Sequence, residues 1–355
     1  WLSTYINKRT KRIMAFTTIN KSTDYFDTKL YTGNNTSQSI TGLNFKPDWC
    51  WIKSRSNTEK HVLQDVLIGT GYELTSQDTS AQNPTSTSIT SFNSDGITVG
   101  SANAVNDNSI NYVNWNWKGN GSGSSNNDGS ITSTVSVDTT SGFSIVKYTG
   151  TGNGGVNTVG HGLGVIPKVI IIKALTTTQG WYQYHESLGN TKVIDFTTAA
   201  AVTNDYWNDT NPTASVFNVI GNTVVGGNYD YIAYCFSDIA GFSKSGSYTG
   251  NGNANGAFVY TGFKPAFVMM KTSSIASNDW VMFDNKRLGY NVSNDSLKPN
   301  SNSAEQTGLD IDLLSNGFKM RGTQNDFNGS GGNYIYMAFA AAPLVGTNNV
   351  PATAR

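Results

Sequence analysis

The sequence predicts an all-β protein built from three tandem antiparallel β-sandwich repeats, jelly-roll-like in plan and about 100 residues each. Three observations support this fold class. A ten-residue pattern occurs three times, aromatic and β-branched residues are abundant beside turn-forming Gly, Asn and Asp, and each copy closes with an alternating aromatic stretch. Glutamate is found only at Glu59, Glu73, Glu186 and Glu305, which is far too rarely for a helical protein of 355 residues.

The repeated pattern reads FKPDWCWIKS at 45–54, VIPKVIIIKA at 165–174 and FKPAFVMMKT at 263–272. In each copy a proline at the third position is followed by a nearly unbroken apolar run, and a lysine stands six residues after the proline. The pairs are Pro47 with Lys53, Pro167 with Lys173, and Pro265 with Lys271. Apolar runs of this length without polar alternation predict a short strand that is covered on both faces. Because proline cannot donate to a ladder, we expect it at the first residue of the strand or on an edge.

Other landmarks recur around this strand. Each copy begins with a strand that ends in Tyr-Thr-Gly, at Tyr31, Tyr148 and Tyr248, and a second strand starts after the proline strand, at His61, Trp181 and Trp280. A hairpin glycine and the first tyrosine of the closing strand follow: Gly96 and Tyr112, Gly221 and Tyr231, Gly317 and Tyr334. We interpret the repeated proline, lysine, glycine and tyrosine as positions that specify the fold rather than contact a ligand.

The landmarks predict the domain organisation. We expect an N-terminal extension at 1–13 ahead of Met14, repeats at 14–118, 142–242 and 243–346, a linker and lead-in at 119–141, and an extended tail at 347–355. The Gly/Ser/Asn-rich stretch 119–130 is typical of a flexible linker. Since a unit of about 100 residues can bury a core of its own, each repeat is expected to be a self-contained domain.

Composition excludes several classes of protein. The formal charge is zero and the pI is near 7.0, so no basic field exists to hold nucleic acid. No window approaches 18 consecutive apolar residues, and the basic N-terminal stretch lacks the apolar core of a secretory signal. Cys50 and Cys235 fall at non-equivalent places in the repeat, so we interpret them as small buried hydrophobic residues rather than a disulfide.

Candidate catalytic and metal-binding residues are few. His161 and His185 lack His or Cys neighbours at ligand spacing, and His61 stands where the other copies have tryptophan, which suggests a half-buried packing role. Asp65 and Asp284 recur at comparable places, and we interpret them as solvated aspartates that cap turns. The glycines of 150–155 match a dinucleotide fingerprint without the helix that must follow. We therefore expect no catalytic residues and no cofactor.

Polar loops offer two weaker possibilities. The Asn/Asp-rich segments 106–109, 204–211 and 322–332 carry oxygen ligands of the kind that calcium takes, although none matches an EF-hand. The aromatic residues Tyr206, Trp207 and Phe327 lie in two of these segments and could contact a glycan by stacking on sugar rings. Ordinary solvated loops are the alternative interpretation of all three segments.

The repeats resemble proteins encoded by tailed bacteriophages, particularly marine ones, that are known only as uncharacterised domains or virion structural components. The resemblance extends over essentially all of 14–355. It is carried by 31–54, 92–97, 112–118, 260–272, 313–320 and 334–349. The second copy departs most, with Ile166 in place of the lysine before proline and Asn222 in place of phenylalanine after Gly221. The family supplies no catalytic residues.

The resemblance implies a non-enzymatic virion structural protein, made in the host cytoplasm and exposed on the particle as a tail-associated, fibre-like or capsid-decorating component. Such a protein is expected to form a homo-oligomer, for example a trimer, and to contact other virion proteins but neither nucleic acid nor membrane. A glycan-binding receptor-recognition protein is the main alternative. A polysaccharide depolymerase would need a carboxylate pair confined to one copy, and the missing signal counts against a cellular adhesin.

Overall fold

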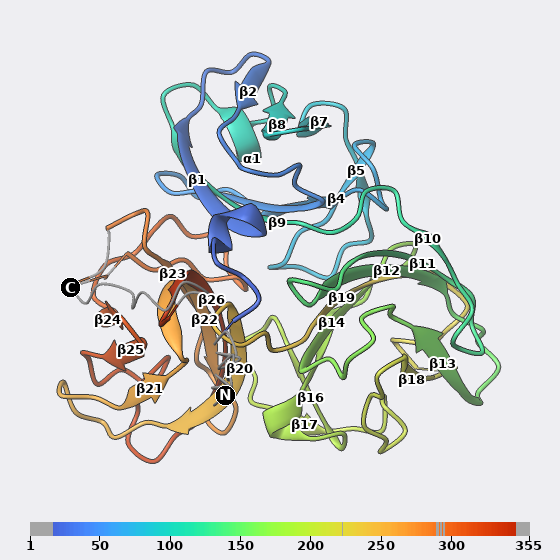
Figure 1. The fold of residues 1–355 in the computed structure, drawn as a ribbon. Coiled ribbons are helices and arrows are strands. Elements are labelled where there is room, and N and C mark those ends of the chain that lie inside the picture. Colours follow the sequence, from blue (N-terminus) through green and yellow to red (C-terminus); the bar gives the residue numbers. More distant parts are fainter. Residues whose placement is uncertain (1–16, 222, 289–290, 292, 294, 346–355) are drawn as a thin grey trace, which may run out of the picture.

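A computed structural model describes residues 17–345, apart from 222, 289, 290, 292 and 294. The predicted extension 1–13 and tail 347–355 lie outside these residues. The described chain is all-β and consists of several antiparallel sheets, as the sequence predicts (Figure 1). The helical segments are short: η1 Ser22–Asp24, α1 Asn103–Asn106 and η2 Glu186–Leu188. No helix in this part of the chain has the length and apolar character needed to cross a membrane.

The strands form three lobes that meet around a common centre (Figure 1). Lobe 1 contains β1 Phe26–Thr32, β2 Gln38–Ile40, β3 Trp49–Ser54, β4 Val62–Asp65, β5 Tyr72–Glu73, β6 Asn83–Pro84, β7 Ile89–Asn93, β8 Gly96–Val99 and β9 Asn111–Trp117. Lobe 2 contains β10 Ser124–Asn126, β11 Ser133–Asp138, β12 Phe143–Thr149, β13 Val156–Gly160, β14 Val169–Ala174, β15 Trp181–His185, β16 Lys192–Asp195, β17 Val202–Thr203, β18 Val216–Ile220 and β19 Asp230–Phe236. Lobe 3 contains β20 Ser243–Thr249, β21 Phe258–Tyr260, β22 Phe263–Thr272, β23 Val281–Asp284, β24 Ile311–Leu314, β25 Gly317–Met320 and β26 Asn333–Pro343.

The main sheet has the same strand order in every lobe. The orders are β1-β9-β3-β4, β12-β19-β14-β15 and β20-β26-β22-β23, so the closing strand always lies between the first strand and the proline strand. In lobe 2 this sheet grows to eight strands, because β10 and β11 add to one edge and β16 and β17 to the other. A smaller sheet faces each main sheet: β2-β8-β7, β13-β18 and β21-β25-β24.

The proline strands are buried along their whole length, as expected for strands covered on both faces. Every residue of β3, β14 and β22 is buried. Pro47 and Pro167 lie just before β3 and β14. Pro265 lies inside β22 at a register shift against β26, and outside the stretch Phe267–Met270 that pairs with β23. The missing N–H therefore interrupts no regular ladder on either side.

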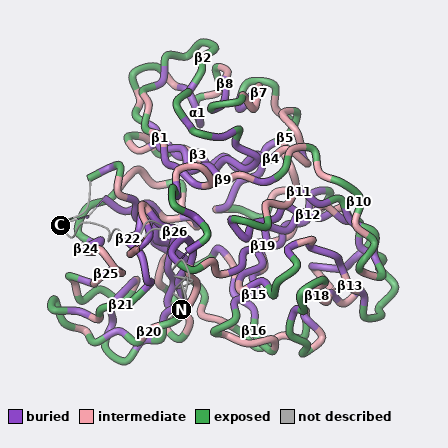
Figure 2. The backbone as a smooth tube through the Cα atoms, in the orientation of Figure 1, coloured by how far each residue is buried: buried purple, intermediate pink, exposed green. Residues whose placement is uncertain are grey.

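The two faces of each main sheet have different neighbours. The outer face packs on the small sheet of its own lobe and forms a separate hydrophobic cluster in each lobe. Cys50 and Cys235 are free thiols buried in two of these clusters, as predicted. The inner faces of all three sheets merge into one central cluster, and Figure 2 shows buried chain where the lobes meet.

Aromatic rings join the lobes in pairs within this central cluster. Ring centroids are 4.2 Å apart for Trp49–Tyr234 (lobes 1 and 2), 5.7 Å for Trp115–Phe267 (lobes 1 and 3), and 5.8 Å for Phe236–Phe339 (lobes 2 and 3). These separations are typical of attractive aromatic pairs. Each lobe therefore has a hydrophobic cluster of its own, and its main sheet also buries one face against the other two lobes.

The stretch 119–130 is held in place and is not the flexible linker that its composition predicts. Asp48 accepts the backbone N–H groups of Gly119 and Gly121 at 2.8 and 3.2 Å. The segment then forms β10, which pairs with β11 at the edge of the lobe 2 sheet. A ladder needs only backbone groups, so a Ser/Asn-rich composition does not prevent pairing.

The hairpin glycine is confirmed in two copies and wrong in the third. A Cβ at Gly96 would lie 1.9 Å from the carbonyl oxygen of Ile40, and one at Gly317 would lie 2.0 Å from that of Val259. Gly221 instead follows the end of β18. The position in lobe 2 that matches Gly317 is Val216, since Val216 pairs with Gly160 as Gly317 pairs with Tyr260.

The repeated tyrosines form a brace in every lobe. The tyrosine of the first strand lies opposite that of the closing strand, and the rings stack at 5.2, 5.1 and 4.9 Å in Tyr31–Tyr112, Tyr148–Tyr231 and Tyr248–Tyr334. Each first tyrosine also donates its hydroxyl to a backbone carbonyl: Val105 at 2.6 Å, Val225 at 2.7 Å and Phe327 at 2.7 Å. This brace gives the tyrosines a structural role.

An excised lobe is predicted not to fold. Residues 243–345 expressed alone should expose the inner face that carries Phe267 and Phe339, and should show collapsed NMR dispersion and strong binding of a hydrophobic dye. The full chain is the control. A well-dispersed spectrum and cooperative unfolding of the excised lobe would contradict the shared core.

Candidate functional site

A hydrogen bond crosses each of the three junctions between lobes, and its donor holds the same repeat position in every lobe. We call these three bonds a cycle because each lobe donates to one neighbour and accepts from the other. Trp181 pairs with Lys173 at the start of β15, and His61 and Trp280 hold the same position immediately before β4 and β23. Each donates a ring N–H to a carbonyl of another lobe: His61 to Lys298 at 3.0 Å, Trp181 to Thr75 at 2.7 Å and Trp280 to Asp195 at 2.7 Å. The acceptors also occupy matching positions. Each comes directly after a residue that pairs with the middle of the second strand: Leu74 with Leu63, Ile194 with Gln183 and Leu297 with Met282. Lobe 1 thus bonds to lobe 3, lobe 3 to lobe 2, and lobe 2 to lobe 1.

His61 is fully buried, so the expected half-buried role is wrong. Its Nδ1 accepts the indole N–H of Trp51 at 2.8 Å, and its Nε2 makes the bond to the neighbouring lobe. Burial, together with the nearby charge of Lys53, lowers the pKa of His61 to about 3. The ring therefore stays neutral and serves as one acceptor and one donor.

A second cycle lies at the other end of the same strands. Asp65, Asp284 and His185 occupy matching places opposite Trp49, Phe267 and Val169. The bonds between lobes are Tyr234 Oη to Asp65 at 2.7 Å, Trp115 Nε1 to Asp284 at 3.1 Å, and His185 Nε2 to the Tyr336 carbonyl at 3.1 Å. They link the same pairs of lobes as the first cycle.

Asp65 and Asp284 are turn caps, as predicted, but they are buried rather than solvated. One oxygen of Asp65 accepts the N–H groups of Leu67 and Ile68, at 2.7 and 3.0 Å. The other oxygen accepts the hydroxyl of Tyr234 from lobe 2, and the packing of the two lobes leaves Asp65 fully buried. Burial raises the pKa of Asp65 to about 6.

The repeated lysines also lie at the junctions. Lys173 donates to the Thr79 carbonyl in lobe 1 at 3.0 Å, and Lys271 donates to the Thr198 carbonyl in lobe 2 at 3.4 Å. Lys53 instead bonds the carbonyl of Ser54 in its own lobe at 2.8 Å. Burial lowers the pKa of each of these lysines to about 8. All three lysines donate to backbone carbonyls, so each ammonium group holds a loop against the end of its strand.

An ion cluster fills the junction of lobes 1 and 3. Glu305 bonds Arg55 and Arg287, with a nitrogen–oxygen distance of 2.7 Å in both pairs. Arg287 also bonds Asp284 at 2.7 Å. Each of these two carboxylates therefore faces a guanidinium.

The predicted glycan contacts are corrected in two of three cases. Trp207 and Phe327 are buried in the cores of lobes 2 and 3, so their ring faces are not available to a sugar. Trp207 donates its indole N–H to the Lys192 carbonyl at 3.0 Å, which anchors the loop inward. Tyr206 is half-buried and lines a surface pocket.

The segments proposed for calcium use their polar groups locally. The side-chain amides of Asn106 and Asn328 donate to Gly100 and Gly322 at 2.6 and 2.7 Å, and so fix matching turns in lobes 1 and 3. His161, which lies outside these segments, donates its Nε2–H to the backbone carbonyl of Thr213 at 3.1 Å. Across the described residues there is no group of three or more His, Cys, Asp or Glu side chains placed to hold a metal ion.

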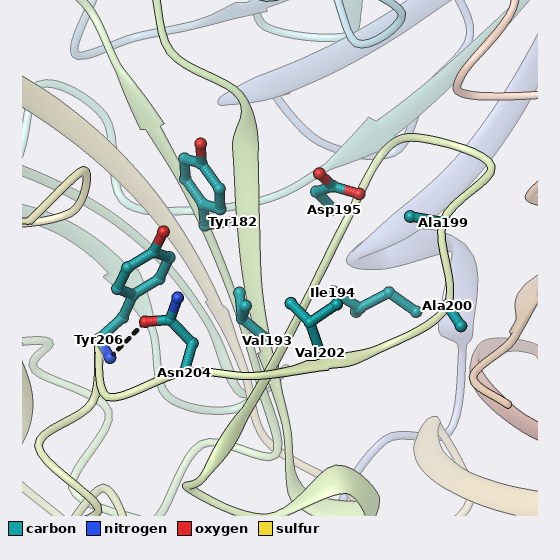
Figure 3. A pocket seen from close by; sticks show the side chains of 9 residues that line it. All are labelled: Tyr182, Val193, Ile194, Asp195, Ala199, Ala200, Val202, Asn204 and Tyr206. Atoms are coloured by element: carbon teal, nitrogen blue, oxygen red, sulfur yellow. Dashed lines mark hydrogen bonds between the residues drawn. The ribbon is translucent and has the colours of Figure 1, made fainter. Parts of the chain in front are cut away.

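The surface pocket belongs to lobe 2 (Figure 3). It lies over β15, β16 and β17 and is lined among others by Tyr182, Val193, Asp195, Val202, Asn204 and Tyr206. Of these residues only Tyr206 was expected to contact a ligand. Two tyrosine rings, a carboxylate and an amide around an apolar floor give it the mixed chemistry of a ligand site.

A pH effect is predicted for His61. Its folded pKa of about 3 lies below the unfolded value near 6.5, so the unfolded chain binds more protons and stability falls as the pH drops through this window. His61→Gln retains a donor but does not titrate. The free energy of unfolding of the native chain should therefore fall relative to the variant by about 1.4 kcal/mol per pH unit between pH 6 and 4. Urea titrations measure it, and a difference that is the same at pH 7 and pH 4 would refute the assignment.

A second prediction concerns the bond between Tyr234 and Asp65. Tyr234→Phe leaves a buried carboxylate oxygen without its donor, which should lower the free energy of unfolding by roughly 1–3 kcal/mol. Tyr260→Phe, which changes an exposed tyrosine, is the matched control and should have little effect. Equal denaturation midpoints for the two variants would show that the bond contributes nothing.

Comparisons with known proteins place the chain in one family. No curated protein and no solved structure shows significant similarity to it. Residues 21–343 match a family described as a domain of unknown function, DUF7483. The match spans all three lobes and both cycles of junction bonds. The chain is therefore a member of the DUF7483 family.

Proposed function

We propose that this chain is a non-enzymatic structural protein of a bacteriophage virion, carried on the outside of the particle as a tail-associated, fibre-like or capsid-decorating component. The observation that carries the proposal is the closure of three lobes around one aromatic core. A body closed in this way resists shear and local opening, because no lobe can separate without exposing the core. Such rigidity suits a part that bears load.

The finer architecture belongs to the same proposal. The lobes would be three copies of one β-sandwich module, jelly-roll-like, arranged around a pseudo-threefold axis. The identical strand orders and the cyclic bonds at matching positions support it. One polypeptide would then build what a homotrimer builds from three chains, with the advantage that each junction can carry its own side chains.

The closed arrangement of the three lobes limits which surfaces can contact other proteins. Since the inner faces already cover one another, contacts with further copies or with other virion proteins would use the outer surfaces of the lobes. A homo-oligomer therefore remains part of the proposal, but it is not needed to bury the core. The zero formal charge suits a component that must avoid adhesion to the packaged nucleic acid.

Purified particles test the proposal. Density-gradient fractions of a phage that encodes this chain should contain it by mass spectrometry, and a reconstruction of the particle should show a three-lobed density on its exterior. A replication protein of the same phage is the control and should be absent from the banded particles. Recovery of the chain from the soluble lysate alone would overturn the proposal.

A further inference from the structure

The alternation of strand residues assembles a polar and aromatic surface on lobe 2. Tyr182 pairs with Asp195 across β15 and β16, and Val193 pairs with Val202 across β16 and β17. Paired residues project from the same face of a sheet, and so do residues two apart on one strand. All four side chains therefore lie on one face, and Figure 3 shows them around the pocket.

The loop after β17 adds the remaining groups. The ring of Tyr206 lies edge-on to that of Tyr182, with centroids 5.3 Å apart and planes at 82°. The side-chain oxygen of Asn204 accepts the backbone N–H of Tyr206 at 3.1 Å, which leaves its amide N–H groups to other acceptors. Asp195 uses one oxygen for the Thr197 hydroxyl at 2.6 Å and keeps the second for another donor.

Contacts with lobe 3 fix the wall of the pocket. Lys271 donates to the Thr198 carbonyl at 3.4 Å, and Ala201 donates to that of Ser273 at 3.0 Å. Asp195 itself accepts the indole N–H of Trp280 through its backbone. A wall held at three points from another lobe is formed before any ligand arrives, which lowers the entropic cost of binding.

We infer that this pocket binds a single uncharged pyranose unit of a glycan. Sugar C–H faces pack on tyrosine rings and on the Val193–Val202 floor, while sugar hydroxyls donate to Asp195 and accept from the amide of Asn204. The space, about 380 Å³ with open solvent included, is at the small end for a ligand site. The lining residues include a carboxylate and no Lys or Arg, so the site disfavours uronic and sialic acids.

The site is confined to one lobe. The positions that match Tyr182 are Val62 and Val281, which lack a ring, and those that match Asp195 are Thr75 and Lys298. Among the residues that the structure describes, this combination of side chains therefore occurs in lobe 2 and is not repeated at the matching positions of lobes 1 and 3. This inference gives the glycan-recognition alternative a defined site and does not depend on where the chain lies in a virion.

Saturation-transfer NMR on the full chain tests it, with methyl glucoside, methyl galactoside, methyl mannoside and methyl glucuronide as probes. At least one neutral glycoside should receive saturation, and the glucuronide should not. Tyr206→Ala should weaken the affinity for that glycoside roughly tenfold, and Asp195→Asn should weaken it without altering the fold. Tyr260→Ala, which removes an exposed ring on lobe 3, is the matched control and should bind as the native chain does.

Three results would overturn the inference: no transfer to any neutral glycoside, equal transfer to the glucuronide, or native affinity in both pocket variants. Denaturation curves establish that each variant is folded. If Tyr206→Ala is destabilised, the affinity of Asp195→Asn alone decides the outcome. Because the measurement uses the isolated chain, its failure leaves the virion proposal untouched. Absence of the chain from particles would equally leave this test unaffected.

Discussion

The burial of three sheet faces against one another is the constraint on which the rest of the structure depends. Each main sheet presents large rings inward, and these rings pack on one another within a lobe and on rings of the other two lobes. Tryptophan and tyrosine supply much apolar area, but each also carries one polar atom that is costly to leave unpaired when it is buried. The two cycles of junction bonds follow from this requirement, since Trp115, Trp181, Trp280 and Tyr234 all donate to groups of a neighbouring lobe.

The junctions are similar without being identical, and the differences specify how the lobes are arranged. Lobe 1 uses a histidine where the others use tryptophan, and lobe 2 uses His185 where the others use aspartate. The cluster of Arg55, Arg287 and Glu305 joins only lobes 1 and 3. A buried donor, acceptor or charge tolerates few wrong partners, because a mismatch leaves it desolvated and unpaired. Three different junctions in one chain therefore favour a single cyclic arrangement over alternatives in which lobes exchange places.

The lobes share a structural frame but differ in their outer loops. Tyr31, Tyr148 and Tyr248 brace the same turn in each lobe, and this shared frame leaves the outer loops free to differ. Lobe 2 uses that freedom most, since β16 and β17 extend its sheet and the loop beyond them places Tyr206 over Tyr182. The copy that departs most from the repeat in sequence is thus also the one that carries the candidate sugar pocket.

The sequence by itself determined the strands, their repetition and the burial of the proline strands on both faces, because alternation and apolar run length are local properties of a strand. It could not say what covers each face. The same aromatic pattern suits a closed sandwich and a sheet that shares its face with two others, and only tertiary packing decided for the second. For the same reason Trp207 and Phe327 proved to be core anchors, Asp65 and Asp284 proved to be buried, and Val216 rather than Gly221 took the hairpin position. The candidate pocket was predictable only at Tyr206, since its other residues become neighbours through strand register and through a wall that lobe 3 holds in place.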